Sequence, residues 1–429
     1  MNILILGSGG REHAFAEALC RSENCDKIFV APGNAGTNAK FVNIELDLTD
    51  FESIAKFASE FGIMMIIVGP EAPLAAGIAD YFQKFDYLQN IFVVGPNQHA
   101  AQLESSKHFA KEFMQRHNIP TARYKAFTTE TLEEGITYLE NHPEPIVLKA
   151  DGLAAGKGVL IVPTRAEAQK ELRDMLQGAK FGAAGQKVVI EEFLDGIELS
   201  VFVLTDGKEY VLLPEAKDYK RIGEEDTGLN TGGMGAISPV PFADEAFMQR
   251  VKQQVIEPTI SGLQKDNIAY TGFIFFGLIK VGDNPFVIEY NVRMGDPETE
   301  AVLPRIKSDF FELLLCLHDH RLSDYQMEFD ERAAATVVLV SGGYPGDFEK
   351  GKEITGIEKA NAIDGVHVYH SGTKTSDDGA ILSAGGRVLA VTALGGSLQQ
   401  AVAKANEAAG KINFDGKYNR TDIGYEFRN

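Results

Sequence analysis

The chain has 429 residues, of which 44% are hydrophobic and 24% are charged, which is the composition of an ordinary globular protein. It is too long to fold around one core, so we expect about two to four domains. Its 61 acidic and 41 basic residues give a formal net charge of −20. This charge excludes general binding to a nucleic-acid backbone, which requires a concentrated basic face, but it allows small anionic substrates.

The cysteines and the N-terminus indicate where the protein works. Cys20, Cys25 and Cys316 are odd in number and lack the spacing of a metal site, which favours a reducing cytoplasm. The start MNILILGSGG lacks the basic segment of a signal peptide, and no apolar segment is long enough to span a bilayer. We therefore expect a soluble cytoplasmic protein with no membrane or nucleic-acid partner. The oligomeric state is open, with a monomer favoured.

Residues 1–102 alternate short apolar runs with amphipathic helical patterns. Strands are expected at NILIL, KIFV, IMMIIV and IFVV, and helices are expected to start at Glu12, near Phe51 and near Pro73. This alternation predicts a doubly wound parallel sheet with helices on both faces. Ligands of such sheets bind beyond the carboxyl ends of the strands, which here are the loops GSGGREH, APGNAGT and VGPEAP.

A long helix is predicted between Asn97 and Pro120, where it would link two domains. The next segment, about 122–192, contains the strands IVLKA, VLIV and KVVIEEF. Its turn GLAAGKG joins two strands, so we expect a β-hairpin whose glycine loop acts as a lid. It is not a Walker A loop, because only three residues separate the glycines and Gly158 follows Lys157. Lys157 is either a triphosphate contact or a solvated turn lysine.

The rest of the chain is rich in strands. A polar loop, KDYKRIGEEDTGLNTGGMGAISP, precedes the hairpin formed by YTGFIFFGLIK and NPFVIEYN. After about Arg332 the strands AAATVVLVS, VHVYHSG and GRVLAVTALG and a closing helix predict a small α+β domain. We therefore expect a multidomain α/β and α+β protein with domains at 1–102, 103–329 (lid about 122–192) and 330–429.

The loop GSGGREH follows the first strand as a dinucleotide-binding loop would. Glu12 stands at the third glycine position of G-x-G-x-x-G, where glycine allows the helix to pack closely on the strand. This departure disfavours a nicotinamide-dependent dehydrogenase. Backbone N–H groups at a helix N-terminus, with Arg11 beside them, suit a phosphate. A turn that only connects strand and helix is the alternative.

The stretch VIEYNVRMGDPETE, residues 287–300, gathers carboxylates around one arginine at the end of an apolar strand. Glu289 and Asn291 are two apart, so their side chains share a face of the strand. Their oxygens are hard donors that suit Mg²⁺ held jointly with substrate phosphates. Arg293 could meet phosphate oxygens or a developing oxyanion, which makes a phosphoryl-transfer face. Asp296 is a candidate for holding a substrate amine, and a surface ladder of ion pairs is the alternative.

A second informative stretch is EEFLDGIELS, residues 191–200. Glu191, Phe193 and Leu194 offer a strand end and an apolar wall for an adenine ring, although Phe193 alone is also compatible with a core position. Glu198 can reach ribose hydroxyls. Lys149, expected on a neighbouring strand, would point at the phosphates.

The order of Lys149, the glycine loop, Glu191 to Leu194, Glu198, Glu289 and Asn291 resembles the ATP-grasp fold of carboxylate–amine ligases. Longer segments resemble the phosphoribosylamine–glycine ligase family more closely. These segments are LILGSGGREHA, PGNAGT, VGPEAPLAAGIAD, VLKADGLAAGKGV, EEFLDGIE, DTGLNTGGMGAISP and EYNVRMGDPETE.

This resemblance implies an ADP-forming ligase of de novo purine synthesis that uses ATP and Mg²⁺ or Mn²⁺. Glycine and 5-phosphoribosylamine would react through glycyl phosphate to give glycinamide ribonucleotide, ADP and phosphate. No protein nucleophile is needed, and the sequence offers no convincing Ser-His-Asp or Cys-His arrangement. Catalysis would rest on positioning and charge neutralisation.

The resemblance also implies residue roles. The catalytic residues would be Arg293, Lys149 and Asp296, and the metal ligands Glu289 and Asn291. ATP would be bound by Lys107, Lys149, Lys157, Glu191, Phe193, Leu194 and Glu198. The substrates would be bound by Gly9, Gly10, Arg11, Glu12, Asn34, Glu71, Asp218, Asn230, Thr231, Gly232, Arg293 and Asp296.

One departure from the wider superfamily concerns the metal. Many ATP-grasp enzymes carry another acidic ligand about where this chain has Phe276 and Gly277, so a second tightly held Mg²⁺ is in doubt. The nearest alternative function is another ATP-grasp ribonucleotide ligase of the formyltransferase or carboxylase type. A non-catalytic nucleotide-binding module is disfavoured by the intact Glu289, Asn291 and Arg293.

Overall fold

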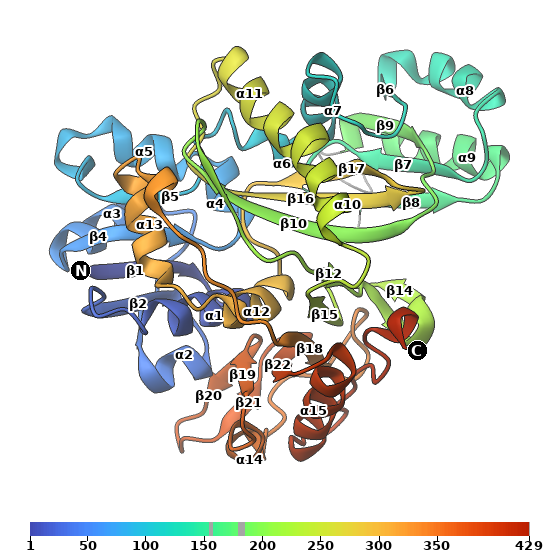
Figure 1. Ribbon diagram of the computed structural model, residues 1–429. Helices are drawn as coiled ribbons and strands as arrows, with labels where there is room; N and C mark the ends of the chain where they lie inside the picture. The colour runs from blue at the N-terminus through green and yellow to red at the C-terminus, as the bar shows by residue number, and fades with distance from the viewer. Residues whose placement is uncertain (154–157, 179–184, 429) are drawn as a thin grey trace.

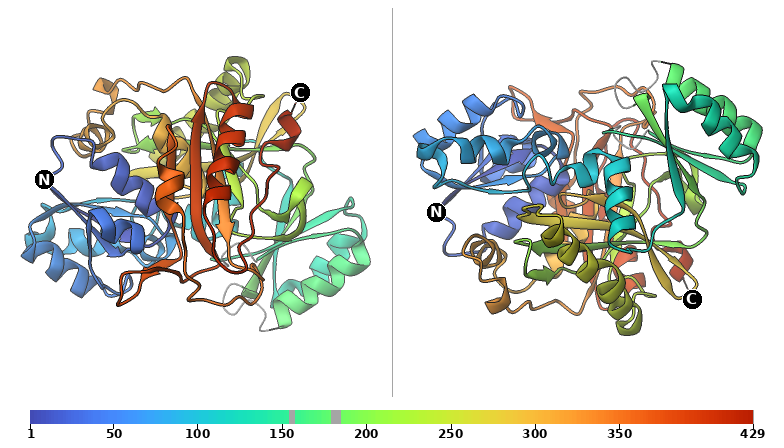
Figure 2. Two further views of the ribbon diagram at one scale, coloured as in Figure 1. Left: turned by 90° about the horizontal axis from the view of Figure 1, so that it is seen from below. Right: turned by 90° about the horizontal axis from the view of Figure 1, so that it is seen from above.

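The computed structural model describes residues 1–153, 158–178 and 185–428 (Figure 1). These residues form an N-terminal sheet, a lid sheet, a central sheet and a C-terminal sheet. The lid projects to the upper right of Figure 1, and the C-terminal region lies below the central sheet. Figure 2 shows that the lid and the N-terminal region stand on opposite sides of the molecule. The expected multidomain class, with a parallel N-terminal sheet, is confirmed.

The N-terminal region is the predicted doubly wound sheet, with strand order β3-β2-β1-β4-β5 and all neighbours parallel. Its strands are β1 (Asn2–Gly7), β2 (Lys27–Pro32), β3 (Val42–Asn43), β4 (Ile63–Val68) and β5 (Phe92–Val94). Its helices are α1 (Gly10–Leu19), α2 (Ala35–Lys40), α3 (Phe51–Glu60), α4 (Glu71–Ala75) and α5 (Ile78–Lys84). The predicted helix near Pro73 is split, because Gly77 adopts a left-handed backbone with φ 88°.

The single long helix predicted between Asn97 and Pro120 is wrong. The segment forms α6 (Gln102–Ser105) and α7 (Lys107–Arg116). Ser106 between them has an extended backbone, and its side chain accepts a hydrogen bond from the Phe109 N–H. A serine that caps a helix N-terminus in this way ends one helix and starts the next.

The lid is a four-stranded antiparallel sheet with order β6-β9-β7-β8. Its elements are β6 (Tyr124–Thr128), α8 (Leu132–Glu140), β7 (Ile146–Ala150), β8 (Val159–Val162), α9 (Arg165–Gln177) and β9 (Lys187–Glu192). The two helices pack on the sheet over a separate apolar cluster, which gives the lid a core of its own. The predicted β7–β8 hairpin is confirmed, while Lys157 in its turn lies outside the described residues.

The central sheet is antiparallel, with order β11-β10-β16-β17. Its strands are β10 (Ile197–Thr205), β11 (Tyr210–Leu212), β16 (Gly272–Val281) and β17 (Asn284–Asn291). Helices α10 (Glu245–Val251) and α11 (Glu257–Lys265) accompany it. The register between β16 and β17 shifts at Gly277 and Leu278, so a bulge precedes the end of β17 where Glu289 and Asn291 lie.

The C-terminal sheet has the order β12-β15-β18-β22-β19. Its strands are β12 (Lys217–Asp218), β15 (Gly235–Ser238), β18 (Ala333–Val340), β19 (Val366–His370) and β22 (Arg387–Gly395). The other elements are α14 (Ile357–Asn361), β20 (Thr373–Thr375), β21 (Ile381–Ser383) and α15 (Leu398–Lys411). The segment before Pro239 that was predicted as a polar loop also contains four short strands, which are β12, β13 (Arg221–Gly223), β14 (Thr227–Asn230) and β15.

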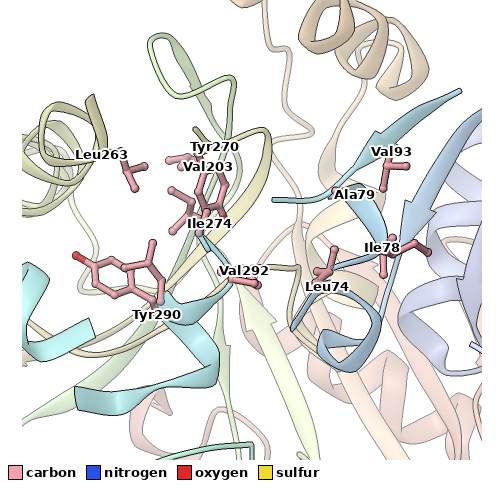
Figure 3. Packing of buried hydrophobic residues seen from close by; sticks show 14 of the residues in the cluster. Leu74, Ile78, Ala79, Val93, Val203, Leu263, Tyr270, Ile274, Tyr290 and Val292 are labelled. Atoms are coloured by element: carbon pink, nitrogen blue, oxygen red, sulfur yellow. The ribbon is translucent and has the colours of Figure 1, made fainter. Parts of the chain in front are cut away.

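The regions share their apolar cores. One cluster runs from the N-terminal helices into the central sheet, and in Figure 3 Val292 lies between Leu74 and Ile78 on one side and Ile274 and Tyr290 on the other. The helices α12 (Glu298–Val302) and α13 (Phe310–His318) pack against α1. The end of β17 is thus held firmly against the first strand–helix loop. Among the described residues, no helix combines the length and apolar character needed to cross a membrane.

Candidate active site

Glu289 and Asn291 occupy the end of β17 as predicted. The Glu289 carboxylate lies 3.5 Å from the Lys107 ammonium at the start of α7. Burial alone would raise the pKa of Glu289, but Lys107, Lys220 and Lys149 outweigh it and lower the pKa to about 2. Glu289 is therefore an ionised carboxylate over the whole physiological pH range.

Asn291 is buried beside Arg293. Its Oδ1 accepts a hydrogen bond from Arg293 Nη2 at 3.2 Å, and its Nδ2 has no partner among the described residues. A carboxylate and an amide oxygen at one strand end fit a hard divalent cation. Gly277 pairs with Glu289, and a Cβ at Gly277 would lie only 3.2 Å from the Glu289 side chain. The glycine itself offers no further ligand at that point of β16. Within the described residues, no group of three or more His, Cys, Asp or Glu is arranged around a metal position.

Arg293 is anchored by two carboxylates from the earlier helices α4 and α6. Its Nη2 donates to Glu104 Oε1 at 2.8 Å, and its Nε lies 3.5 Å from the predicted residue Glu71. Glu104 also accepts a hydrogen bond from the Val292 N–H, at 2.8 Å. Sequence reasoning missed Glu104, because it placed this residue within a long linking helix. The signal that the sequence offered was a single acidic residue in the otherwise uncharged stretch AAQLESS.

Lys149 lies on β7 with its ammonium buried. It donates to the Ile288 carbonyl on β17 at 3.1 Å and lies 3.0 Å from Glu191 Oε2. The same Glu191 oxygen lies 3.1 Å from Lys111 Nζ, a contact that sequence reasoning missed. The Glu191 carboxylate, predicted to touch adenosine, is thus engaged with two lysines.

The strand end after Glu191 is open. Phe193 is 39% exposed and Leu194 is half-buried, so both offer apolar surface to a ring. Glu198 on β10 forms an ion pair of 2.7 Å with Lys220, and this charge lowers the pKa of Glu198.

Lys220 is a second residue that sequence reasoning missed. It also lies 3.8 Å from the predicted residue Asp218 on β12. Burial opposes its charge, yet Asp218, Glu198 and Glu289 raise the pKa of Lys220 well above its ordinary value. Lys220 is therefore a cation that interacts with both the Glu198 carboxylate on β10 and the Glu289 carboxylate on β17. Burial, and then Asp218, raise the pKa of the nearby Glu298 to about 7.

The glycine segment at 230–233 is tied to the C-terminal domain. Asn230 ends β14 and is exposed, while Thr231 donates from its N–H to the Lys220 carbonyl at 2.7 Å. The Gly232 N–H donates to the Tyr344 hydroxyl at 2.9 Å, and its carbonyl accepts from Arg387 at 2.8 Å.

Asp296 is also contacted by the C-terminal domain, through Arg387. Arg387 Nη1 lies 2.8 Å from the Asp296 carboxylate and also donates to its backbone carbonyl at 2.9 Å. Burial opposes ionisation, but Arg387 and Arg11 lower the pKa of Asp296. Sequence reasoning assigned no site residue to the C-terminal domain, so it missed both Arg387 and Tyr344.

The loop at residues 9–12 meets Asp296, as the predicted substrate site requires. A side chain at Gly9 would collide with the Asp296 carboxylate, and one at Gly10 with Glu300. The Gly9 N–H donates to Glu12 Oε2 at 2.6 Å, so Glu12 caps α1. Glycine at both positions lets this loop approach the end of β17 closely.

Arg11 and Asn34 brace this loop. Arg11 is buried, with Nε donating to Glu12 at 2.6 Å and Nη1 donating to the Met294 carbonyl at 3.1 Å. Asn34 caps α2 and donates to the carbonyls of Ser8 and His370, at 2.9 and 2.8 Å. Both residues therefore hold the first domain against the other two.

Several functional groups converge between the lid and the central sheet. They are the lysines on the lid and α7, the carboxylate and amide oxygens on β17, and the anchored Arg293. This fold and this site define an ATP-grasp ligase, a class that uses ATP with a divalent metal. The chain belongs to the phosphoribosylglycinamide synthetase family. The model of its N domain matches residues 1–104, that of its ATP-grasp (A) domain residues 105–299, and that of its C domain residues 334–426.

Relatives match nearly the full length of the chain. A phosphoribosylamine–glycine ligase from Haemophilus influenzae is 47% identical over 428 residues, which are 99% of this chain and 98% of the relative. The crystal structure of phosphoribosylamine–glycine ligase from Thermotoga maritima superposes with a TM-score of 0.83 at 34% identity, covering 98% of this chain and all of that one. The N5-carboxyaminoimidazole ribonucleotide synthetase of the same organism shares the fold, with a TM-score of 0.64 at 18% identity over 96% and 99% of the two chains.

Proposed function

We propose that this protein joins glycine to 5-phosphoribosylamine at the expense of ATP and so makes glycinamide ribonucleotide, ADP and phosphate. The observation that carries this proposal is the meeting of three parts. The loop at Gly9 abuts Asp296, which follows Glu289 and Asn291 closely in the chain. Arg387 links Asp296 to the segment at Gly232. A phosphorylated acid formed at β17 would lie next to an amine held at Asp296.

The reaction has two steps. A glycine carboxylate oxygen attacks the γ-phosphorus of ATP, and ADP leaves, which gives glycyl phosphate. The amine nitrogen of phosphoribosylamine then attacks the glycyl carbonyl, loses a proton, and phosphate leaves. Because the substrates supply both nucleophiles, the protein contributes position and charge rather than a covalent intermediate.

The nucleotide lies between the lid and the central sheet. Lys149, Lys107 and Lys157 neutralise its phosphates, Phe193 and Leu194 cover the adenine, and Glu198 meets the ribose. Glu191 acts on the nucleotide through Lys149, since its carboxylate oxygen Oε2 lies between two lysines. When Glu198 turns to a ribose, Lys220 becomes free to meet a phosphate.

Glu289 and Asn291 would hold the divalent metal, Mg²⁺ or Mn²⁺, jointly with the nucleotide. Both residues fit this role, because Glu289 is ionised and Asn291 brings a buried amide group, whose oxygen is a hard donor, to the same strand end. A bound divalent cation would add positive charge that offsets the charge developing on the transferred phosphoryl group. Arg293, which Glu104 and Glu71 hold in place, stabilises the same charge from the protein side.

The amine and the acid are held by groups that the two outer domains provide. Gly9, Gly10, Arg11 and Glu12 receive the phosphoribosyl group, with Asn34 bracing the loop. Asp296 accepts hydrogen bonds from the amine. Glycine lies under the segment formed by Asn230, Thr231 and Gly232, with Asp218 nearby.

The experiment that tests the function is ADP release from ATP and Mg²⁺ with phosphoribosylamine, with and without glycine, followed by mass spectrometry of the product. ADP and glycinamide ribonucleotide should appear together, and only when glycine is present. Formate and bicarbonate serve as matched controls for the formyltransferase and carboxylase alternative. Turnover with either of them in place of glycine would overturn the proposal.

We also propose a cytoplasmic monomer. The three cysteines are odd in number and lack the spacing of a metal site, which favours a reducing compartment. Cell fractionation and light scattering of the purified chain test these two points, and a stable dimer would contradict the second.

A further inference from the structure

Lys111 is a buried lysine for which the proposed reaction has no direct use. It lies on α7 one turn after Lys107, so the two side chains share one face of the helix. Lys107 reaches the metal carboxylate Glu289, while Lys111 is 2% exposed and reaches Glu191 on the lid. A lysine is rarely buried so completely unless its ammonium group is paired with an acidic group.

The surroundings of Lys111 form a chain of three charges. Glu191 Oε2 lies 3.1 Å from Lys111 and 3.0 Å from Lys149, while Glu191 Oε1 is buried without a partner among the described residues. One carboxylate oxygen thus serves two ammonium groups. The remaining net positive charge is available to a nearby anion.

Each lysine has a second fixed contact. Lys111 donates to Thr121 Oγ1 at 2.7 Å, and Thr121 in turn donates to the Val287 carbonyl on β17 at 2.6 Å. Lys149 donates to the Ile288 carbonyl at 3.1 Å. Both lysines are therefore tied to successive carbonyls of the strand that carries Glu289. These contacts use two of the three N–H donors of Lys149, which leaves one for a phosphate oxygen.

We propose that Lys111 is a positioning residue for the nucleotide: it draws on the charge of Glu191 and so keeps the Lys149 ammonium in place and incompletely neutralised, ready for an ATP phosphate. This inference rests on the proposed function of the site and assigns a role within it. Without Lys111, Glu191 would pair with Lys149 alone, and the rotamer of its carboxylate would lose one of its two anchors.

The charge on Lys111 is itself sensitive to pH. Burial lowers the pKa of Lys111 to about 8, partly offset by Glu191, and Lys149 lowers it further. Glu192, also on β9, favours the charged form, and the Tyr124 ring on β6 lies 5.7 Å from the ammonium. Nucleotide affinity should therefore weaken as the pH rises through about 8.

The test is the Kd of a non-hydrolysable Mg²⁺–ATP analogue, measured by calorimetry between pH 6.5 and 9.5 on the full-length protein. Lys111→Met should raise the Kd about tenfold or more at pH 7 and remove the alkaline loss of affinity. The KM for glycine should change less than about twofold. Lys125→Met, at an exposed lysine of β6, is the matched control and should behave like the wild type.

Thr121→Val is the milder variant, which keeps the charge but removes one hydrogen bond that stabilises it. Its alkaline loss of affinity should begin at lower pH than in the wild type, and it carries the test if Lys111→Met does not fold. The inference is overturned if Lys111→Met shifts only the melting temperature, or if the alkaline loss persists in it. Because analogue binding is measured without turnover, failure of this inference is separable from failure of the glycine assignment.

Discussion

Glu289 is half-buried, with 29% of its side chain exposed, and it nevertheless keeps a full negative charge. Burial alone would favour the neutral acid, yet Lys107, Lys220 and Lys149 lower its pKa to about 2. Those lysines neutralise the carboxylate in the absence of metal. At the residue scale, the negative charge of Glu289 is therefore offset by lysines, and a divalent cation could take the place of a lysine ammonium beside it.

Glu289→Gln should reduce kcat by at least about 100-fold, because it removes the ionised oxygen while keeping the shape of the side chain. The variant should keep the far-ultraviolet circular dichroism of the wild type but lose the rise in melting temperature produced by a Mg²⁺–ATP analogue. Glu245→Gln, at an exposed position that starts α10, is the control. An unfolded Glu289→Gln would point instead to a structural role.

At the scale of elements, the C-terminal domain contributes two side chains to the site, one from a loop and one from a strand. Tyr344 and Arg387 both contact Gly232 from outside the ATP-grasp region, and Arg387 extends to Asp296. The segment at 230–233 is thus shaped by a domain that follows it by a hundred residues. A change in the C-terminal domain should therefore affect glycine use without touching the nucleotide.

Tyr344→Phe removes only the hydroxyl that accepts from the Gly232 N–H. We expect kcat/KM for glycine to fall about 3- to 10-fold, in keeping with one hydrogen bond that positions a loop. The KM for ATP should stay unchanged. Steady-state kinetics with each substrate varied in turn measures both, and an equal effect on ATP would show that the contact does not act on glycine alone.

A pair of buried histidines joins α1 to β19. The His370 N–H donates to His13 Nδ1 at 2.9 Å, and the rings lie 5.7 Å apart. Burial, aided by Lys40, lowers the pKa of His13 to about 4, and burial, aided by His13, lowers that of His370 to about 3. Both therefore fold in the neutral form.

Acid should weaken this junction. The unfolded chain binds protons near the ordinary histidine pKa of 6.5, whereas the folded chain does not, so stability is complete above that pH and falls towards about 4. Urea unfolding between pH 4.5 and 8 measures how the free energy of unfolding changes with pH. Each unit of histidine pKa shift should cost about 1.4 kcal/mol of that free energy at the acid end. His370→Gln should flatten the profile, while His99→Gln, at an exposed residue, should not. An unchanged slope in His370→Gln would rule the pair out as its source.

At the scale of the whole molecule, one apolar cluster crosses the boundary between the first domain and the central sheet (Figure 3). It includes Leu74 on α4 and Ile274 on β16, both fully buried. Two domains that share a core in this way should lose their structure together rather than one after the other.

Leu74→Ala should lower the free energy of unfolding by about 2–5 kcal/mol, because the cavity lies in the shared cluster. Circular dichroism and calorimetry should still show the first domain and central sheet melting in one shifted transition. Met64→Ala, at a position 45% exposed, should change the stability little. A separate early transition for the first domain alone would contradict the shared core.

Much of the fold could be predicted because its signals are local. The parallel N-terminal sheet follows from alternating apolar runs, and the β7–β8 hairpin from a glycine turn between two strands. One incorrect prediction and one incomplete prediction have local causes as well. Ser106 divided a helix whose pattern looked continuous, and the segment 217–238 hid short strands among polar residues.

The domain boundaries predicted at 1–102, 103–329 and 330–429 stay predictions. The sheet that holds most of the last region also includes β12 and β15 from residues 217–238. A strand joins the sheet that offers it a partner, whatever its place in the chain, so sequence order is a poor guide to this boundary.

By itself the sequence determined the class of fold and the family, and it pointed to the two residues of β17 that we propose as metal ligands, since each depends on short motifs read in order. Only the tertiary structure decided which charges meet. Lys111 shares Glu191 with Lys149, Glu104 holds Arg293, and Arg387 reaches Asp296 across domains. Such contacts are set by how separate elements pack, and Coulomb interactions depend on distance in space and on burial, which the order of residues along a chain does not record.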